Sequence, residues 1–285
     1  MRLLTLSDSW AHGTELWDPN LGPQKYSFPL EHQEHIDYRN KHAWPGQISK
    51  LLGATELINL GWPGCSNDSI MRRLTRWLAN EGYLTGRPAN DLMVIVGWTK
   101  LDSREFVPSY TDEYNDICNW PYTDDCWVTV QPPSFESNRW EKSHSVPAVD
   151  EFSRTYYHKW CNPTEYFHRY INQNWIFQQM MSSIGANWFS YQSVLDNVDL
   201  KFDDWKDYNA NVLTAKLDPA DLILWETIDP KRFYNKNAPC CTFHNFLMTS
   251  GLPRDVVMYK THPTEYGHEL WANEIFRYMK SNNIV

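Results

Sequence analysis

The sequence predicts an α/β protein in which helices cover both faces of a parallel β-sheet, a three-layer α/β/α sandwich. Short apolar runs alternate along the chain with segments whose apolar residues recur at helical spacing, as in repeated strand–helix units. The run 92–96, Leu-Met-Val-Ile-Val, is apolar throughout, as a strand buried on both faces of a parallel sheet should be. Turn residues follow several of these runs directly and mark the strand ends.

Strands and helices are expected in alternation on either side of one irregular segment. The expected strands are short apolar runs, at 3–6, 56–60, 92–96, 187–192, 222–225 and 256–259. The expected helices share an apolar face and a stop signal, and they end at Gly53, Gly82, Gly185 and near Lys280. Ser66 or Asn67 is the expected cap of the second helix.

The length of 285 residues fits one domain spanning 1–285. Residues from about 100 to 163 break the alternation, since this stretch is rich in Pro, Trp, Tyr and Asp without a clear period. A structureless loop of that length is improbable inside a compact domain. We therefore expect an aromatic-rich insertion at about 100–163 that forms a cap over the sheet edge or the site.

Composition excludes several classes of partner. The formal net charge is -9 and no long basic run offsets it, which argues against a nucleic-acid partner. No window approaches the ~20 apolar residues of a membrane span, and the apolar opening meets Ser7-Asp8-Ser9 too early for a secretory signal. A soluble, cytoplasmic protein is expected. The six cysteines form no C-x-x-C pair, so neither a metal nor a cofactor is expected, and the thiols should be reduced.

Two polar segments follow the first two strands, at the edge where sites of parallel sheets lie. Ser9 comes just after the first strand, where a serine can act as a nucleophile at a helix start or simply cap that helix. The segment 59–68 follows the second strand and contains Gly64, whose backbone N–H could approach a substrate closely. Its Pro63-Gly64 pair could equally form a plain tight turn.

Two further segments follow later strands. Thr99 comes after Val96-Gly97-Trp98, where its hydroxyl could donate a hydrogen bond into the same site or merely satisfy backbone groups. His262 precedes Pro263 between the last strand and the last helix, a position that suits a general base, although a single histidine is more often structural.

Together the four segments resemble the SGNH (GDSL-like) hydrolase superfamily, and most of all its phage-encoded members. The order Ser9, Gly64, Thr99, His262 follows the block order of that superfamily, and the resemblance covers residues 1–99 and about 164–285. It implies a flavodoxin-like parallel sheet and an ester hydrolysis in which Ser9 attacks and His262 takes its proton. It also implies an oxyanion hole formed by Ser9, Gly64 and Thr99.

The sequence departs from the superfamily pattern at three positions. Ser7 stands where a glycine is usual, Thr99 where an asparagine is usual, and Tyr259 where an acidic residue usually precedes the histidine by three. We therefore expect a Ser9–His262 dyad steadied by a backbone carbonyl, with an acid from elsewhere, such as Asp255 or Glu226, as the alternative.

Three functions are compatible with the sequence. The first is an esterase acting on a small-molecule or carbohydrate ester, for example a carbohydrate O-deacetylase. The second is a non-catalytic binding or virion-associated protein on the same fold, which the Thr99 and Tyr259 departures favour, in a host cytoplasm or a virion if the chain is phage-encoded. The third is an acyltransferase that uses the same residues with another acceptor.

Overall fold

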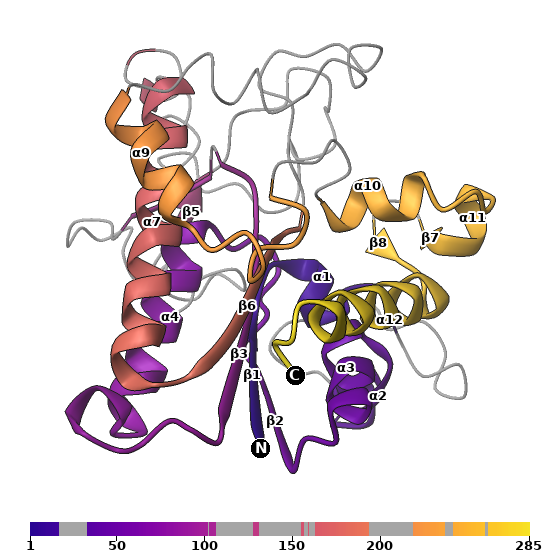
Figure 1. Ribbon diagram of the computed structural model, residues 1–285. Coiled ribbons are helices and arrows are strands. Elements are labelled where there is room, and N and C mark those ends of the chain that lie inside the picture. The colour runs from indigo at the N-terminus through magenta and orange to yellow at the C-terminus, as the bar shows by residue number, and fades with distance from the viewer. Residues whose placement is uncertain are drawn as a thin grey trace, which may run out of the picture.

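The computed structural model describes residues 1–16, 33–101, 103–106, 128–130, 155–156, 159, 163–193, 219–236, 242–259 and 262–285. Its centre is a parallel four-stranded sheet in the order β2-β1-β3-β6. These strands are β1 (Arg2–Leu6), β2 (Glu56–Asn59), β3 (Leu92–Trp98) and β6 (Asn187–Gln192). Helices cover both faces of the sheet (Figure 1), which confirms the predicted α/β class.

The two helical layers differ in their members. One face carries α4 (Asn67–Asn80), α7 (Pro163–Ile184) and α9 (Pro219–Thr227). The other carries α3 (Trp44–Leu52) and α12 (Glu265–Ser281), with α2 (Gln33–His42) packed beside them. A short 3-10 helix, η1 (Tyr83–Thr85), joins α4 to β3.

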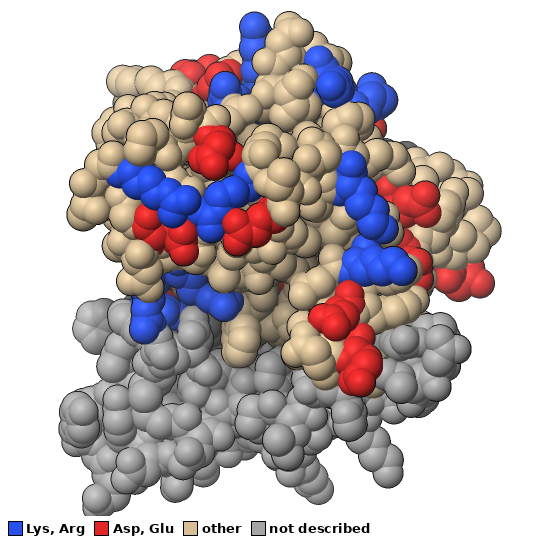
Figure 2. Space-filling model, turned by 90° about the horizontal axis from the view of Figure 1, so that it is seen from below, with Lys and Arg blue, Asp and Glu red and all other residues tan. Residues whose placement is uncertain are grey.

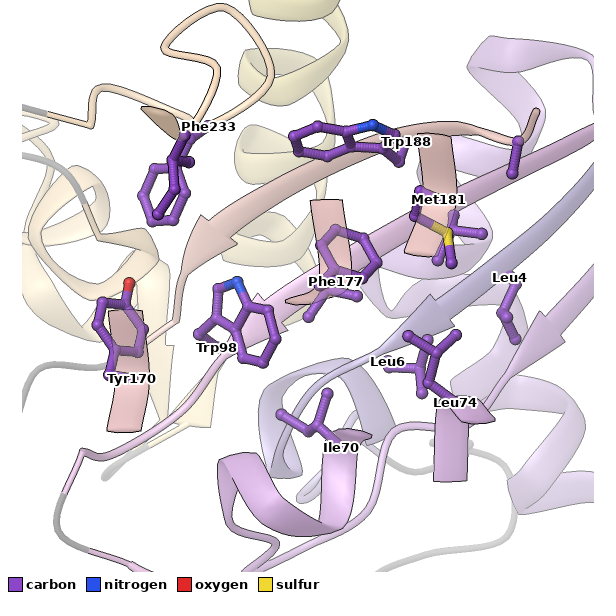
Figure 3. Close-up of a cluster of buried hydrophobic side chains, with 14 of the residues drawn as sticks. Leu4, Leu6, Ile70, Leu74, Trp98, Tyr170, Phe177, Met181, Trp188 and Phe233 are labelled. Carbon is purple, nitrogen blue, oxygen red and sulfur yellow. The ribbon is translucent and has the colours of Figure 1, made fainter. Parts of the chain in front are cut away.

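Alternate residues of the strands supply the two halves of the core, because successive strand side chains point to opposite faces. Leu4 and Leu6 face α4 and α7, where Trp98 packs edge-to-face on Phe177 with ring centroids 5.9 Å apart (Figure 3). Leu3 on the same strand lies in the cluster formed with α3 and α12. Strands β1, β3 and β6 are thus buried on both faces, which leaves the carboxyl ends of the strands as the usual place for a site in a parallel sheet.

The predicted helix signals are confirmed where the structure describes them. Ser66 caps α4, accepting a hydrogen bond from the Ser69 N–H at 3.2 Å. Gly53 ends α3 in the left-handed conformation at φ 61°, which glycine adopts without steric cost.

Two predicted strands are wrong. Residues 222–225 lie inside α9, because a four-residue apolar run cannot distinguish a strand from a buried helix segment. Residues 256–259 are divided between α11 (Arg254–Val257) and β7 (Met258–Tyr259). β7 pairs antiparallel with β8 (His262–Pro263) and not with the main sheet. Within the described residues, the sheet continues beyond β6 as isolated parallel bridges from Ser190 to Phe233 and from Gln192 to Thr242.

Most of the predicted insertion at 100–163 lies outside the described residues. Its described part contains a two-stranded antiparallel ribbon of β4 (Arg104–Phe106) and β5 (Val128–Val130). Arg72 of α4 donates two hydrogen bonds to the buried Glu105 carboxylate, at 2.9 and 2.8 Å, which fixes the ribbon against the helical layer. The cap and the single-domain organisation remain predictions.

Charged side chains of both signs are interspersed on the face seen in Figure 2. Arg2, for example, donates to Glu56 at 2.6 Å and to Glu81 at 3.1 Å. No helix within the described ranges is long and apolar enough to cross a membrane. Cys65 is buried with a free thiol, whereas the other five cysteines lie outside the described residues.

Candidate active site

Ser9 is the first residue of the short helix α1 (Ser9–His12), three residues beyond the end of β1. The helix is capped by Asp8, whose Oδ1 accepts a hydrogen bond from the Trp10 N–H at 3.0 Å. Trp10 and Ala11 are buried and anchor the helix against the sheet. The cap residue is therefore Asp8, which leaves the Ser9 hydroxyl available for another partner.

That partner is His262. Its Nε2 lies 3.0 Å from the Ser9 Oγ, although 253 positions separate the two residues. His262 opens β8 in the hairpin with β7, and α12 begins three residues later with Thr264 as its cap. Figure 1 shows this hairpin beside α1, so the structure brings together the two residues predicted to react.

The other ring nitrogen of His262 faces a carboxylate. Glu15 Oε2 lies 2.9 Å from His262 Nδ1, and both side chains are largely buried. The expected dyad with a backbone carbonyl is therefore wrong, and neither Asp255 nor Glu226 is the acid at this nitrogen. The acid comes instead from the turn that follows the nucleophile's own helix.

This turn holds Glu15 in an unusual backbone conformation. Glu15 has φ 71°, in the left-handed region that side-chain-bearing residues rarely adopt. Gly13 has φ 76° and ends α1, and the Leu16 N–H donates to the Gly13 carbonyl at 3.0 Å. Buried Leu16 anchors the turn. Backbone strain of this kind clusters at functional sites, and the Glu15 side chain here contacts His262.

The two contacts of His262 define its protonation pattern. A neutral imidazole carries one N–H, and a carboxylate can only accept. With Glu15 at Nδ1, the proton belongs on Nδ1 and the lone pair on Nε2, where it accepts the Ser9 hydroxyl. This is the tautomer that a general base needs toward a serine.

The Asp8 side chain, which follows β1, forms hydrogen bonds with residues at the carboxyl ends of β3 and β6. Its buried carboxylate accepts from the Thr99 hydroxyl at 2.9 Å, after β3, and from the Ser193 hydroxyl at 3.2 Å, after β6. Burial raises the pKa of Asp8, while its hydrogen bonds and the nearby His262 oppose that rise. Each donor compensates part of the cost of a buried carboxylate.

Thr99 does not use its hydroxyl as the sequence predicts. The hydroxyl donates to Asp8, and the backbone N–H donates to Asn67 Oδ1 at 2.8 Å. Thr99 is only 3% exposed. An oxyanion contact from this hydroxyl would first require the bond to Asp8 to break.

Gly64 lies in the turn after β2, which docks onto the end of β1. The Trp62 N–H donates to the Ser7 carbonyl at 3.0 Å, and the Cys65 thiol donates to the same oxygen at 3.4 Å. Gly61 allows this approach, because a Cβ there would lie 2.6 Å from the His12 backbone nitrogen. Gly64 itself has φ 71°.

Two further histidines near His262 are held neutral. Burial lowers the pKa of His12 to about 3, assisted by the charges of Arg39, Arg73 and His262. Burial likewise lowers the pKa of His268 to about 3, and its Nδ1 accepts from the Trp44 N–H at 3.3 Å. Neither histidine adds a positive charge beside His262 at neutral pH.

Sequence reasoning missed Glu15, the capping role of Asp8 and the contribution of Ser193. The signal for Glu15 was weak, since it lies six residues after Ser9 behind a glycine and no motif marks it. Among the described residues, no cluster of three or more His, Cys, Asp or Glu could hold a metal ion.

The fold and this site define a three-layer α/β protein with a Ser–His–Glu chain of hydrogen bonds at the carboxyl edge of its sheet. The chain belongs to DUF6071, a family of unknown function, whose pattern matches residues 30–284. Ser9 and Glu15 lie before the matched range. No curated protein matches the chain.

Two solved structures resemble the whole chain at low identity. One is the psychrotrophic esterase EstA from Pseudoalteromonas sp., inhibited by monoethylphosphonate, with TM-score 0.45, 10% identity, and coverage of 98% of this chain and 97% of that one. The other is a putative lipolytic protein of the G-D-S-L family from Desulfitobacterium hafniense DCB-2, with TM-score 0.43, 11% identity, and coverage of 97% and 98%. At these TM-scores the likeness does not define the reaction of this chain.

Proposed function

We propose that the protein is a serine hydrolase of ester bonds. The observation that supports it most strongly is the continuous chain from the Ser9 Oγ through His262 to Glu15, with contacts of 3.0 and 2.9 Å. Nucleophile, base and orienting acid in this order are the arrangement that activates a serine hydroxyl. The presence of an acid also weakens the non-catalytic alternative, because Glu15 supplies the carboxylate that is missing at Tyr259, one of the two departures that favour that alternative.

The proposed reaction has two halves. Ser9 Oγ attacks the ester carbonyl while its proton moves to His262 Nε2, and the carbonyl oxygen becomes an oxyanion. The bond to the alcohol then breaks, and His262 returns the proton to the departing alcohol oxygen. A water molecule attacks the resulting acyl-Ser9 by the same route, which releases the acid and restores the serine. Glu15 stabilises the imidazolium that forms in each half.

The proposed oxyanion hole uses backbone N–H groups. As the first residue of α1, Ser9 has an N–H that no carbonyl of its own helix can accept, and this helix end favours negative charge. Gly64 supplies the second donor from the turn docked beside Ser7. Thr99 supports this hole indirectly, by holding the Asp8 cap in place.

The test is turnover of a short-chain aryl acetate by the purified full chain. The native protein should release the alcohol, and Ser9→Ala should abolish release while its thermal midpoint stays close to native. Turnover that survives in Ser9→Ala would overturn the proposal. Adding glycerol separates hydrolysis from acyl transfer, since a transferase would form acetylglycerol instead of free acetate.

A further inference from the structure

The hairpin that carries His262 also carries a tyrosine directly beside it. In the pairing of β7 with β8, Tyr259 is opposite His262. Directly opposed residues of antiparallel strands project to the same face, with Cβ atoms about 5 Å apart. The Tyr259 ring therefore stands on the face of the hairpin from which His262 reaches Ser9.

The burial of the two β7 residues agrees with this orientation. Met258 is 4% exposed and packs into the core cluster formed with α3 and α12, whereas Tyr259 is 44% exposed. Residues that precede Tyr259 in the sequence also expose apolar side chains. Among the described residues, four of the ten exposed large hydrophobic side chains fall between positions 248 and 259, namely Met248, Leu252, Val256 and Tyr259. An exposed aromatic ring opposite the proposed base suits contact with a ligand.

The chemistry of His262 indicates which half of an ester would meet Tyr259. The oxyanion is directed toward backbone donors at Ser9 and Gly64, on the side of β1 and β2. The departing alcohol must lie on the side of His262, because Nε2 returns the proton to its oxygen. A residue paired with His262 is therefore a neighbour of the alcohol and not of the oxyanion.

We propose that Tyr259 is a specificity-determining residue that packs against the alcohol half of the substrate, and that this alcohol carries a ring. The inference rests on the proposed ester hydrolysis. A flat aromatic side chain gains most from another flat face, which an aryl group provides through its π-system and a pyranose through its C–H groups. Both ring types share this chemistry, and the substrates of the test separate them.

The experiment compares three acetates that differ only in the alcohol: phenyl acetate, an acetylated methyl glucoside and ethyl acetate. Native protein, Tyr259→Ala and Tyr259→Phe are compared as full chains. Tyr259→Ala should raise KM about tenfold for at least one ring-bearing acetate and less than twofold for ethyl acetate, with kcat little changed. Tyr259→Phe should keep the native preference, because the ring and not the hydroxyl makes the contact.

Tyr266→Ala is the matched control, since Tyr266 is also 44% exposed but belongs to the first turn of α12. It should leave all three KM values within twofold of native. An equal change of KM on all three acetates in Tyr259→Ala would overturn the inference, as would a loss of ring preference in Tyr266→Ala alone. In either case a native turnover that depends on Ser9 leaves the proposed function intact. Absence of native turnover on every acetate would overturn both.

Discussion

Glu15 Oε2 lies 2.9 Å from His262 Nδ1, although 247 positions separate the two residues. The acid is therefore on the same short segment as the nucleophile Ser9, and the base reaches both from the opposite end of the chain. The left-handed backbone of Glu15 directs its side chain back toward the hairpin. Residues 9–15 thus contact both ring nitrogens of His262. The position of Glu15 relative to Ser9 depends on the turn at Gly13.

We predict that Glu15→Gln lowers kcat about 10²–10⁴-fold with a small change in KM. A glutamine amide can donate to Nδ1, which would shift the histidine proton to Nε2 and remove the acceptor for the Ser9 hydroxyl. Steady-state kinetics on an aryl acetate checks the effect.

Asp255→Asn is the control for this variant. Asp255 is an exposed acid in α11, three residues before β7 begins. It should keep kcat within twofold of native. Equal activity of Glu15→Gln and native protein would show that His262 needs no acid.

Thr99→Val separates two roles of the Thr99 hydroxyl. If it holds Asp8, its loss leaves a buried carboxylate one donor short and lowers the free energy of unfolding by about 1–3 kcal/mol. If it contacts the oxyanion, kcat falls about 10²-fold while stability changes little. We predict the first pattern, measured by urea unfolding together with kinetics. Thr99→Ser keeps the hydroxyl and should remain close to native in both.

Gly64→Ala tests the backbone donor of the oxyanion hole, with Gly53→Ala as its matched control. Both glycines have left-handed φ, 71° and 61°, and an added Cβ would meet nothing within 4 Å at either position. Both variants should lose about 1–2 kcal/mol of stability through backbone strain alone. Only Gly64→Ala should also lower kcat, by on the order of tenfold. Equal kinetics in the two variants would remove Gly64 from the hole.

His268 should make stability depend on pH. Burial, followed by the charge of His262, lowers its pKa from 6.5 to about 3. Between these values the unfolded chain holds a proton that the folded chain does not. The free energy of unfolding therefore falls as pH drops from about 6.5 toward 3, by up to about 1.4 kcal/mol per pH unit from this residue.

His268→Asn should reduce that dependence, because an asparagine oxygen can still accept the Trp44 N–H but does not titrate. His12, whose pKa burial also lowers to about 3, keeps its own share of the dependence. Urea unfolding at pH 7 and pH 5 measures the difference. A native slope that the substitution leaves unchanged would show that His268 is protonated in both states or in neither.

The sequence allowed the sheet and both helical layers to be predicted from local patterns, whereas the Ser9–His262 pair was predicted from the resemblance to the SGNH superfamily, since 253 positions separate the two residues. The all-apolar β3 and the glycine that stops α3 are signals that neighbouring residues carry themselves. The strand predicted at 222–225 was wrong because so short a run has no period, and the helix signal at Pro219 was overlooked.

Glu15 could not be predicted for a different reason. Its role depends on a positive φ at a residue with a side chain, and on a hairpin built more than 240 positions later. Tertiary contacts select such a conformation, and no local preference favours it. The hydrogen bond from the Thr99 hydroxyl to Asp8 could not be predicted either, since 91 positions separate the two residues.

The most direct test of Ser9 as an activated nucleophile is its covalent labelling by a fluorophosphonate, located by peptide mass spectrometry. We predict one modified residue, Ser9, in the native protein, with labelling lost in Ser9→Ala and strongly slowed in Glu15→Gln and His262→Ala. Ser69→Ala, which removes a buried serine hydroxyl from α4, serves as the control and should label at the native rate. A native protein that takes up no label, or takes it up at a residue other than Ser9, would contradict the account.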